Sequence, residues 1–224
     1  MFVAMKMIPL LLMALSLAFP LSAQNRTYST FWHQRASLFE KLSVNKDDIL
    51  FVGNSISNGG EWAELFHNPR VKNRGISGDI CMGVFDRLQP LLKGSPAKIF
   101  LMIGINDLGR GTSPDSIICQ TDRIIGKIQE ESPETSIYLQ SILPVNESFG
   151  MFEGHTRQRE IIAPLNLRLK QLAEKRKVIY IDLYSHFVEP GTDKLDPAYS
   201  NDGLHLMGAG YLKWAELVKP YIDK

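Results

Sequence analysis

Five short strand-like runs alternate with helical segments along most of this 224-residue chain. The runs are ILFV at 49–52, RVKNRGI at 70–76, AKIFLMIG at 97–104, SIYLQSIL at 136–143 and VIYIDL at 178–183. Apolar spacing and turn residues predict helices at 29–42, 60–66, 79–92, 113–131 and 157–177, and from 208 onward. Short apolar runs are typical of strands buried on both faces, and their alternation with helices calls for a parallel sheet. We therefore expect one α/β domain, a three-layer sandwich in which helices cover both faces of a five-stranded parallel sheet.

Composition and charge narrow the classes of function. Hydrophobic residues make up 44% of the chain, which is enough for the core of one domain of this size. The formal net charge is +1, so no excess of charge points to nucleic acid or to an anionic membrane surface. No cluster of His, Cys and Asp has the spacing of metal ligands, and the sequence has no glycine-rich phosphate loop. We therefore expect no nucleic-acid partner, no metal and no other cofactor.

The first 23 residues have the pattern of a secretory signal peptide. A single basic residue, Lys6, precedes the apolar run IPLLLMALSLAF, and the small residue Ala23 follows it. The run is short for a membrane-spanning helix, which needs about 20 residues, and an uncleaved anchor is the alternative. We expect a signal peptide at 1–23, a mature domain at 24–224, export to the periplasm or the exterior, and no stable membrane insertion after cleavage.

The two cysteines, Cys81 and Cys119, fall in separate predicted helices. Two cysteines of an exported protein could pair. Sequence alone does not determine whether these two meet, however. We therefore expect buried free thiols, with a disulfide as the alternative.

Polar clusters follow the predicted strands, at the points where the strands end. Gly53-Asn54-Ser55 follows the first run, GISGD at 75–79 the second and GIND at 104–107 the third. A fourth cluster, NDGLHLMGAGY at 201–211, leads into the last helix. Parallel sheets bind ligands at the carboxyl ends of their strands, so we expect these clusters to meet at one edge of the sheet.

One serine, one histidine and one aspartate among these clusters fit nucleophilic catalysis. A serine hydroxyl such as that of Ser55 needs a base to take its proton, and the base needs a group that orients it. His205 is the candidate base, and Asp202 lies three residues before it, so its carboxylate can curl back onto the same imidazole. Gly203 between them eases a tight turn. Taken singly, each residue has an ordinary structural explanation, such as a helix cap for Ser55 or Asp202.

Acyl transfer by a serine also needs donors for the oxyanion of the tetrahedral intermediate. The candidates are the backbone N–H groups of Ser55 and Gly78 and the side-chain amide of Asn106. Glycine lets a substrate approach the main chain, and an asparagine amide donates without titrating. Alone, Gly78 reads as a turn and Asn106 as a turn or helix cap.

The four clusters together resemble the SGNH hydrolases, also called the GDSL esterase/lipase family. The resemblance runs from about 48 to 211 and is strongest in NRGISGD, GIND and DGLHLMGAGY, which look like the branch with platelet-activating-factor acetylhydrolase subunits and bacterial carbohydrate acetylesterases. It implies a flavodoxin-like sandwich and places the family's Ser, Gly, Asn, Asp and His on Ser55, Gly78, Asn106, Asp202 and His205. The first block departs from the family, since Asn54 stands where Gly-Asp-Ser is usual. The Gly-x-Ser-x-Gly elbow of α/β-hydrolases fits worse, because position 57 is Ser.

The resemblance implies a secreted acetylesterase that acts on a small-molecule or glycan ester. The loops after the strands are short and polar apart from Met151-Phe152 and Met82, which favours a small acyl group. A lysophospholipase or short-chain lipid esterase is the second hypothesis, and a catalytically silent flavodoxin-like binding domain is the third. The sequence leaves the oligomeric state open.

The remaining aromatic and histidine residues are interpreted as structural. His33, His67 and His155 have no neighbouring carboxylate in a motif, and His186 follows the fifth run, where it could line the site. Trp62 is a candidate sugar platform, but a buried helical tryptophan is the favoured interpretation.

Overall fold

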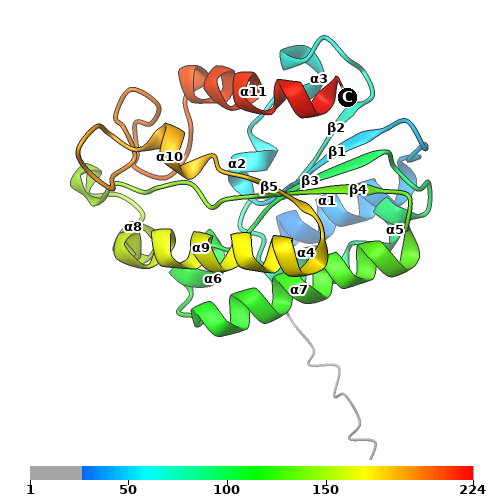
Figure 1. Ribbon diagram of the computed structural model, residues 1–224, viewed down its shortest axis with the longest axis horizontal. Helices are drawn as coiled ribbons and strands as arrows, with labels where there is room; N and C mark the ends of the chain where they lie inside the picture. The colour runs from blue at the N-terminus through cyan, green and yellow to red at the C-terminus, as the bar shows by residue number, and fades with distance from the viewer. Residues whose placement is uncertain (1–26, 224) are drawn as a thin grey trace, which may run out of the picture.

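Five parallel strands form the central sheet, in the order β2-β1-β3-β4-β5 (Figure 1). The strands are β1 (Ile49–Gly53), β2 (Val71–Gly75), β3 (Lys98–Met102), β4 (Ser136–Gln140) and β5 (Ile179–Ile181). The computed structural model describes residues 27–223, so the predicted signal peptide at 1–23 lies outside the described residues. This strand order is that of flavodoxin-like folds, and it confirms the expected α/β class.

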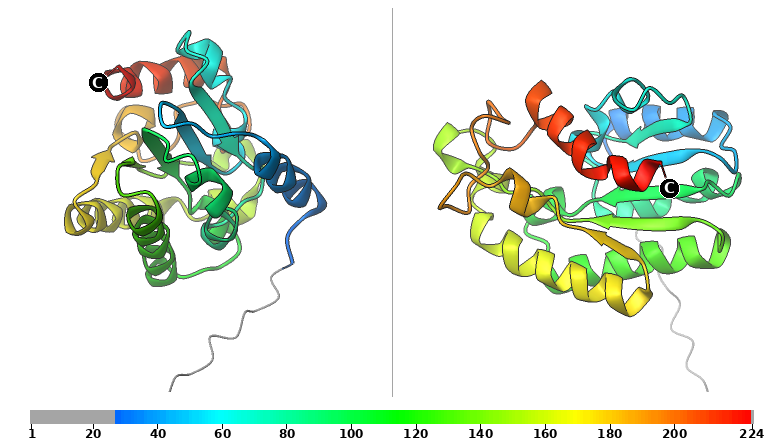
Figure 2. Two further views of the ribbon diagram at one scale, coloured as in Figure 1. Left: turned by 90° about the vertical axis from the view of Figure 1, so that its right-hand side faces the viewer. Right: turned by 45° about the horizontal axis from the view of Figure 1, so that its top comes forward.

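Helices cover both faces of the sheet. Figures 1 and 2 show α3 and α11 on one face and α7 and α9 on the other. The helices are α1 (Thr30–Lys41), α2 (Ser55–Asn58), α3 (Trp62–Leu65), α4 (Cys81–Asp86), α5 (Gln89–Leu92), α6 (Ile105–Gly109), α7 (Pro114–Glu131), α8 (Glu153–Thr156), α9 (Arg159–Arg176), α10 (Tyr184–Phe187) and α11 (Gly208–Ile222), with a 3-10 turn, η1, at Glu147–Phe149. Within residues 27–223, no helix has both the length and the apolar character that crossing a bilayer requires.

A ladder of aromatic rings ties three strands together on the face that α3 and α11 cover. Phe51, Phe100 and Tyr138 lie in register on β1, β3 and β4, with ring centroids 4.8 and 4.5 Å apart. Trp62 stacks on Phe51 at 4.0 Å and meets Trp214 of α11 at 4.7 Å. Trp62 is only 1% exposed, so it is a core residue and not a sugar platform. The burial of such rings stabilises the three layers by the hydrophobic effect.

The bounds of several elements differ from those that the apolar pattern predicts, and two of the differences have a clear physical cause. The run at 136–143 leaves the sheet after Gln140, because the Asn166 side chain of α9 binds both backbone groups of Ile142 at 2.8 Å. The helix expected at 79–92 divides into α4 and α5, since Pro90 has no N–H to continue a helical hydrogen-bond ladder. The segment 145–156, which lies between the fourth predicted strand and the helix expected at 157–177, contains η1 and α8.

Candidate active site

In the sheet, β1 lies between β2 and β3, so the connection after β1 leads to one side of it and the connection after β2 leads to the other. The strands β1 and β3 therefore form the topological switch point of the sheet. Open α/β sheets bind their ligands at the carboxyl ends of the strands at such a point. Ser55 opens α2 directly after β1, and Asn106 lies in α6 after β3. Gly78 follows the neighbouring strand β2. Three of the predicted site residues therefore lie at one edge of the sheet.

The turn that presents Ser55 depends on its two preceding residues. A Cβ on Gly53 would lie 2.3 Å from the Met102 carbonyl oxygen and 2.4 Å from Ser57 Oγ, so no larger residue fits without a shift. Asn54 caps α2, because its side-chain oxygen accepts a hydrogen bond from the Ile56 N–H at 3.0 Å. The departure from Gly-Asp-Ser therefore preserves the helix cap.

Ser55, His205 and Asp202 form one hydrogen-bonded chain. Ser55 Oγ lies 3.0 Å from His205 Nε2, and His205 Nδ1 lies 2.8 Å from Asp202 Oδ2. The other carboxylate oxygen, Oδ1, accepts the backbone N–H groups of His205 at 2.7 Å and Leu204 at 2.8 Å. Gly203 adopts a φ of 79°, the left-handed conformation that lets the chain fold back in this way. The predicted Asp202–His205 pair is thus brought to the predicted nucleophile from 150 residues away.

The surroundings of Asp202 favour its ionised form. Burial opposes ionisation, but hydrogen bonds from the His205 and Leu204 backbone and from the His205 ring outweigh it and lower the pKa of Asp202. A carboxylate held in this way orients the imidazole and keeps the hydrogen on Nδ1. His205 Nε2 is then free to accept the Ser55 proton.

Two hydrogen bonds join the loop after β2 to α6 and its C-cap residue, Arg110. Asn106 Nδ2 donates to the carbonyl oxygen of Asp79 at 2.8 Å, and Arg110 Nη2 donates to the Gly78 carbonyl oxygen at 2.8 Å. Gly78 has a φ of 78°, which disfavours any other residue there. Ser77 Oγ binds Asn58 Oδ1 at 3.1 Å, so the same loop also rests on α2, the helix that begins with Ser55.

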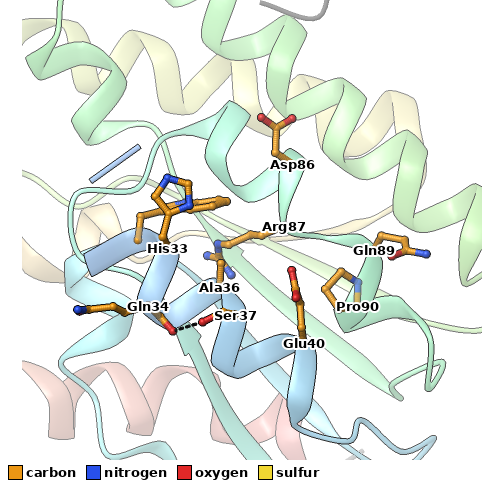
Figure 3. Close-up of a pocket in the computed structure, with 10 residues that line it drawn as sticks. His33, Gln34, Ala36, Ser37, Glu40, Asp86, Arg87, Gln89 and Pro90 are labelled. Carbon is orange, nitrogen blue, oxygen red and sulfur yellow. Dashed lines mark hydrogen bonds between the residues drawn. The ribbon is translucent and has the colours of Figure 1, made fainter. Parts of the chain in front are cut away.

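A buried ion pair between Arg87 and Asp79 holds the loop after β2 in place. Arg87 Nε donates to Asp79 Oδ2 at 2.7 Å, and Arg87 Nη2 donates to the Gly53 carbonyl oxygen at 3.1 Å. Trp32 Nε1 of α1 donates to Asp79 Oδ1 at 3.0 Å. A cavity of about 550 Å³ lies beside this network, between α1 and the segment that carries Asp86 and Pro90 (Figure 3). The cavity does not include the Ser55–His205–Asp202 chain.

Asp107, next to Asn106, connects α6 to α4. Both of its carboxylate oxygens lie 3.1 Å from the backbone nitrogen of Cys81, the first residue of α4. Burial raises the pKa of Asp107 to about 6, although the Cys81 N–H favours the carboxylate. Asp107 therefore lies next to a site residue in the chain, but no described hydrogen bond connects its carboxylate to Ser55.

Sequence reasoning missed His155. It was interpreted as structural, yet its Nε2 lies 3.0 Å from Asn106 Oδ1. The ring of Phe152 makes an edge contact with each of the two histidines, with its centroid 5.0 Å from that of His205 and 6.3 Å from that of His155. Because His155 lies in a mostly polar segment with no periodic pattern, no local signal in the sequence marks it.

Other expectations for single residues have mixed outcomes. His33 of α1 contacts the rings of its neighbour Trp32 and of Tyr28, which precedes the helix, and His186 is exposed on α10. Met82 is buried in α4, so it adds no apolar surface at the site.

The two cysteines are both free. Cys81 is buried and Cys119 is exposed. The alternative of a disulfide is therefore wrong, and the expectation of a buried thiol is wrong for Cys119. Cys119 lies on the long helix α7, where it lines a hollow between α7 and α9, and apolar spacing alone did not indicate its exposure.

Comparison with known proteins gives one family. The family model described as GDSL-like lipase/acylhydrolase matches residues 51–213. This range includes all five predicted site residues, from Ser55 to His205. The comparison with curated proteins found no significant match.

Solved structures share the fold over most of their length. One from Streptococcus pneumonia, provisionally described as a platelet activating factor, is 30% identical with a TM-score of 0.78, over 86% of this chain and 92% of that one. A provisionally described acylhydrolase from Bacteroides fragilis is 25% identical with a TM-score of 0.75, over 88% and 98%. The acetylxylan esterase Axe2 of Geobacillus stearothermophilus, solved as a catalytic mutant, is 19% identical with a TM-score of 0.65, over 80% and 95%, a likeness of fold.

Proposed function

The chain belongs to the GDSL-like lipase/acylhydrolase family, and we propose that it is a secreted serine esterase that removes short acyl groups, acetyl first, from carbohydrate O-esters. Membership makes the protein a carboxylic ester hydrolase. The observation that carries the proposed mechanism is the hydrogen-bonded chain from Ser55 Oγ through His205 to Asp202.

In the first half of the proposed reaction, Ser55 Oγ attacks the ester carbonyl carbon while His205 Nε2 takes the hydroxyl proton. The carbonyl oxygen becomes an oxyanion, which the N–H groups of Ser55 and Gly78 and the Asn106 amide stabilise. The tetrahedral intermediate collapses when the bond between the carbonyl carbon and the leaving alcohol oxygen breaks, and His205 donates the proton to that alcohol oxygen. The acyl group is then bound to Ser55 Oγ.

In the second half, water attacks the acyl group on Ser55 while His205 takes one of its protons. The bond between the acyl carbon and Ser55 Oγ then breaks, and the proton returns to Ser55. The products are a carboxylic acid and free enzyme. Asp202 stabilises the His205 imidazolium in both halves.

The carbohydrate and acetyl preferences rest on the resemblance to acetylesterases and on the predicted signal peptide. Axe2, which shares the fold, is named an acetylxylan esterase. Export supports a substrate outside the cytoplasm, such as an O-acetylated glycan. The start of the exported protein, determined by N-terminal sequencing, is expected close after Ala23, and an intact leader in the mature protein would contradict the proposed cleavage.

A lipid esterase is the second candidate, and one observation favours it. Phe152, which contacts the His205 ring, is 41% exposed. Its chain neighbour Met151 is 48% exposed, and Met207, two positions after His205, is 37% exposed. Apolar side chains at the rim of a site can receive an acyl chain or a lipid surface. Rates on acetylated sugars, p-nitrophenyl esters of increasing chain length and lysophospholipid distinguish the two candidates.

A fluorophosphonate probe tests the nucleophile before any substrate is assumed. We expect labelling of the wild type and none of Ser55→Ala. Ser57→Ala, two residues along in the same helix, is the matched control and is expected to label normally. A folded wild type that resists the probe would instead support a catalytically silent binding domain.

A further inference from the structure

We infer that His155 is a positioning residue that holds the Asn106 amide in the orientation an oxyanion requires. The inference deepens the proposed esterase function and rests on it. It gives a role to a side chain that the proposed mechanism does not use.

The neighbours of Asn106 determine which way its amide faces. The Asp79 carbonyl oxygen can only accept, so the atom 2.8 Å from it is the amide nitrogen. Asn106 Oδ1 therefore faces His155 Nε2 at 3.0 Å, and Nε2 must carry the hydrogen of that bond. With one N–H bound to Asp79 and the oxygen bound to His155, the second N–H of Asn106 is held in a single direction and remains for an oxyanion.

Small residues let α8 come close enough for this contact. A Cβ on Gly109 would lie 2.6 to 2.9 Å from three atoms of the His155 ring, so glycine leaves the space that the imidazole occupies. A Cβ on Gly154 would lie 3.2 Å from the Gly109 carbonyl oxygen. Phe152 precedes α8 with a φ of 50°, a conformation that costs free energy in a bulky residue. The fold thus accepts backbone strain in the segment that carries both Phe152 and His155.

His155 also suits the electrostatics of the proposed reaction. Burial lowers the pKa of His155, and the charges of His205 and Arg110 lower it further, so the neutral ring is favoured. A neutral donor orients Asn106 without placing a second positive charge near His205 when that residue becomes an imidazolium. A lysine or arginine in the same place would oppose that step.

The test compares two substitutions of His155, by Gln and by Asn, which carry the same amide group on side chains of different length. Gln places its amide nitrogen near the position of His Nε2, and Asn places it near that of Nδ1. We expect His155→Gln to keep kcat within about threefold of the wild type, while His155→Asn and His155→Leu lower it about tenfold with KM nearly unchanged. Tenfold is the order expected when one orienting hydrogen bond is lost.

A double-mutant cycle separates positioning from packing. In an Asn106→Ala background, His155→Leu is expected to have no further effect on kcat, because the group it orients is absent. The inference is overturned if the two losses multiply, or if His155→Leu leaves kcat unchanged. If His155→Leu does not fold, equal rates for the folded Gln and Asn variants overturn it instead. A wild type with no esterase activity would overturn the proposed function itself, whereas an active wild type with indifferent His155 variants overturns this role alone.

Discussion

Replacing Asp202 by Asn separates the chemical role of this carboxylate from its structural role. In the wild type, Oδ2 accepts the Nδ1 hydrogen of His205, while Oδ1 accepts two backbone N–H groups. An asparagine oxygen can keep both backbone bonds, which turns its NH₂ group toward Nδ1. An NH₂ group can only donate, so the ring hydrogen moves to Nε2. His205 then donates to Ser55 Oγ and can no longer take its proton.

The expected cost falls almost entirely on catalysis. A triad histidine in the wrong tautomer lowers kcat by about 10⁴-fold, which corresponds to about 5.5 kcal/mol of transition-state stabilisation. Three of the four hydrogen bonds to the Asp202 carboxylate can be kept, and the fourth, to His205 Nδ1, is reversed and no longer involves a charged acceptor, so the free energy of unfolding should fall by only about 1 kcal/mol. For a domain of this size, that change lowers Tm by about 2 to 4 °C.

The assay measures kcat on p-nitrophenyl acetate together with Tm. Asp196→Asn is the matched control, because Asp196 makes a similar bond to the backbone N–H of Ala198 in the preceding turn. We expect the control to have wild-type kcat. A folded Asp202→Asn enzyme with kcat within tenfold of the wild type would refute the reasoning, since another group would then orient His205.

Three further predictions concern stability and access. The raised pKa of Asp107 means that its carboxyl binds a proton more tightly in the folded state than in the unfolded state, so the contribution of Asp107 to stability should fall as pH rises from about 4 to about 6, which adds a downward slope to the free energy of unfolding. Asp107→Asn should remove this slope in chemical denaturation, and an unchanged slope would contradict it. Gly78→Ala should lower the free energy of unfolding by about 1 kcal/mol and reduce kcat, because φ is 78° there; unchanged Tm and kcat would count against the turn geometry. Iodoacetamide should alkylate Cys119 in the folded protein and Cys81 only after denaturation, because Cys119 is exposed and Cys81 is buried. Mass spectrometry measures both, and rapid labelling of Cys81 in the folded protein would contradict its buried position.

Local patterns were sufficient where the physics is local. Short apolar runs predicted four of the five strands, since a strand buried on both faces needs apolar side chains on both. The remaining strand, β2, has the mostly polar sequence VKNRG and gave a weaker signal. The helix expected at 113–131 is α7, because Ser113 caps it and Pro114 suits its first turn. The Asp202–His205 contact was also predictable, since only three residues separate the pair.

Boundaries were less predictable, because they depend on distant partners. The strand at 136–143 ends at Gln140 since a side chain of α9, 24 residues further along, binds the backbone of Ile142. Apolar character alone does not distinguish a strand residue from a buried residue just beyond the sheet. Exposure of Cys119 likewise depends on how α7 is turned against its neighbours.

By itself, then, the sequence determined the class of fold, the order of the strands along the chain and the chemical types of the candidate residues. Only the tertiary structure decided that Ser55 and His205, 150 residues apart, share a hydrogen bond, and that His155 meets Asn106 across 49 residues. The second contact exists because α8 packs on α6 over Gly109 and Gly154. Such packing depends on the combined shape of two segments, and neither segment encodes it in its own periodicity.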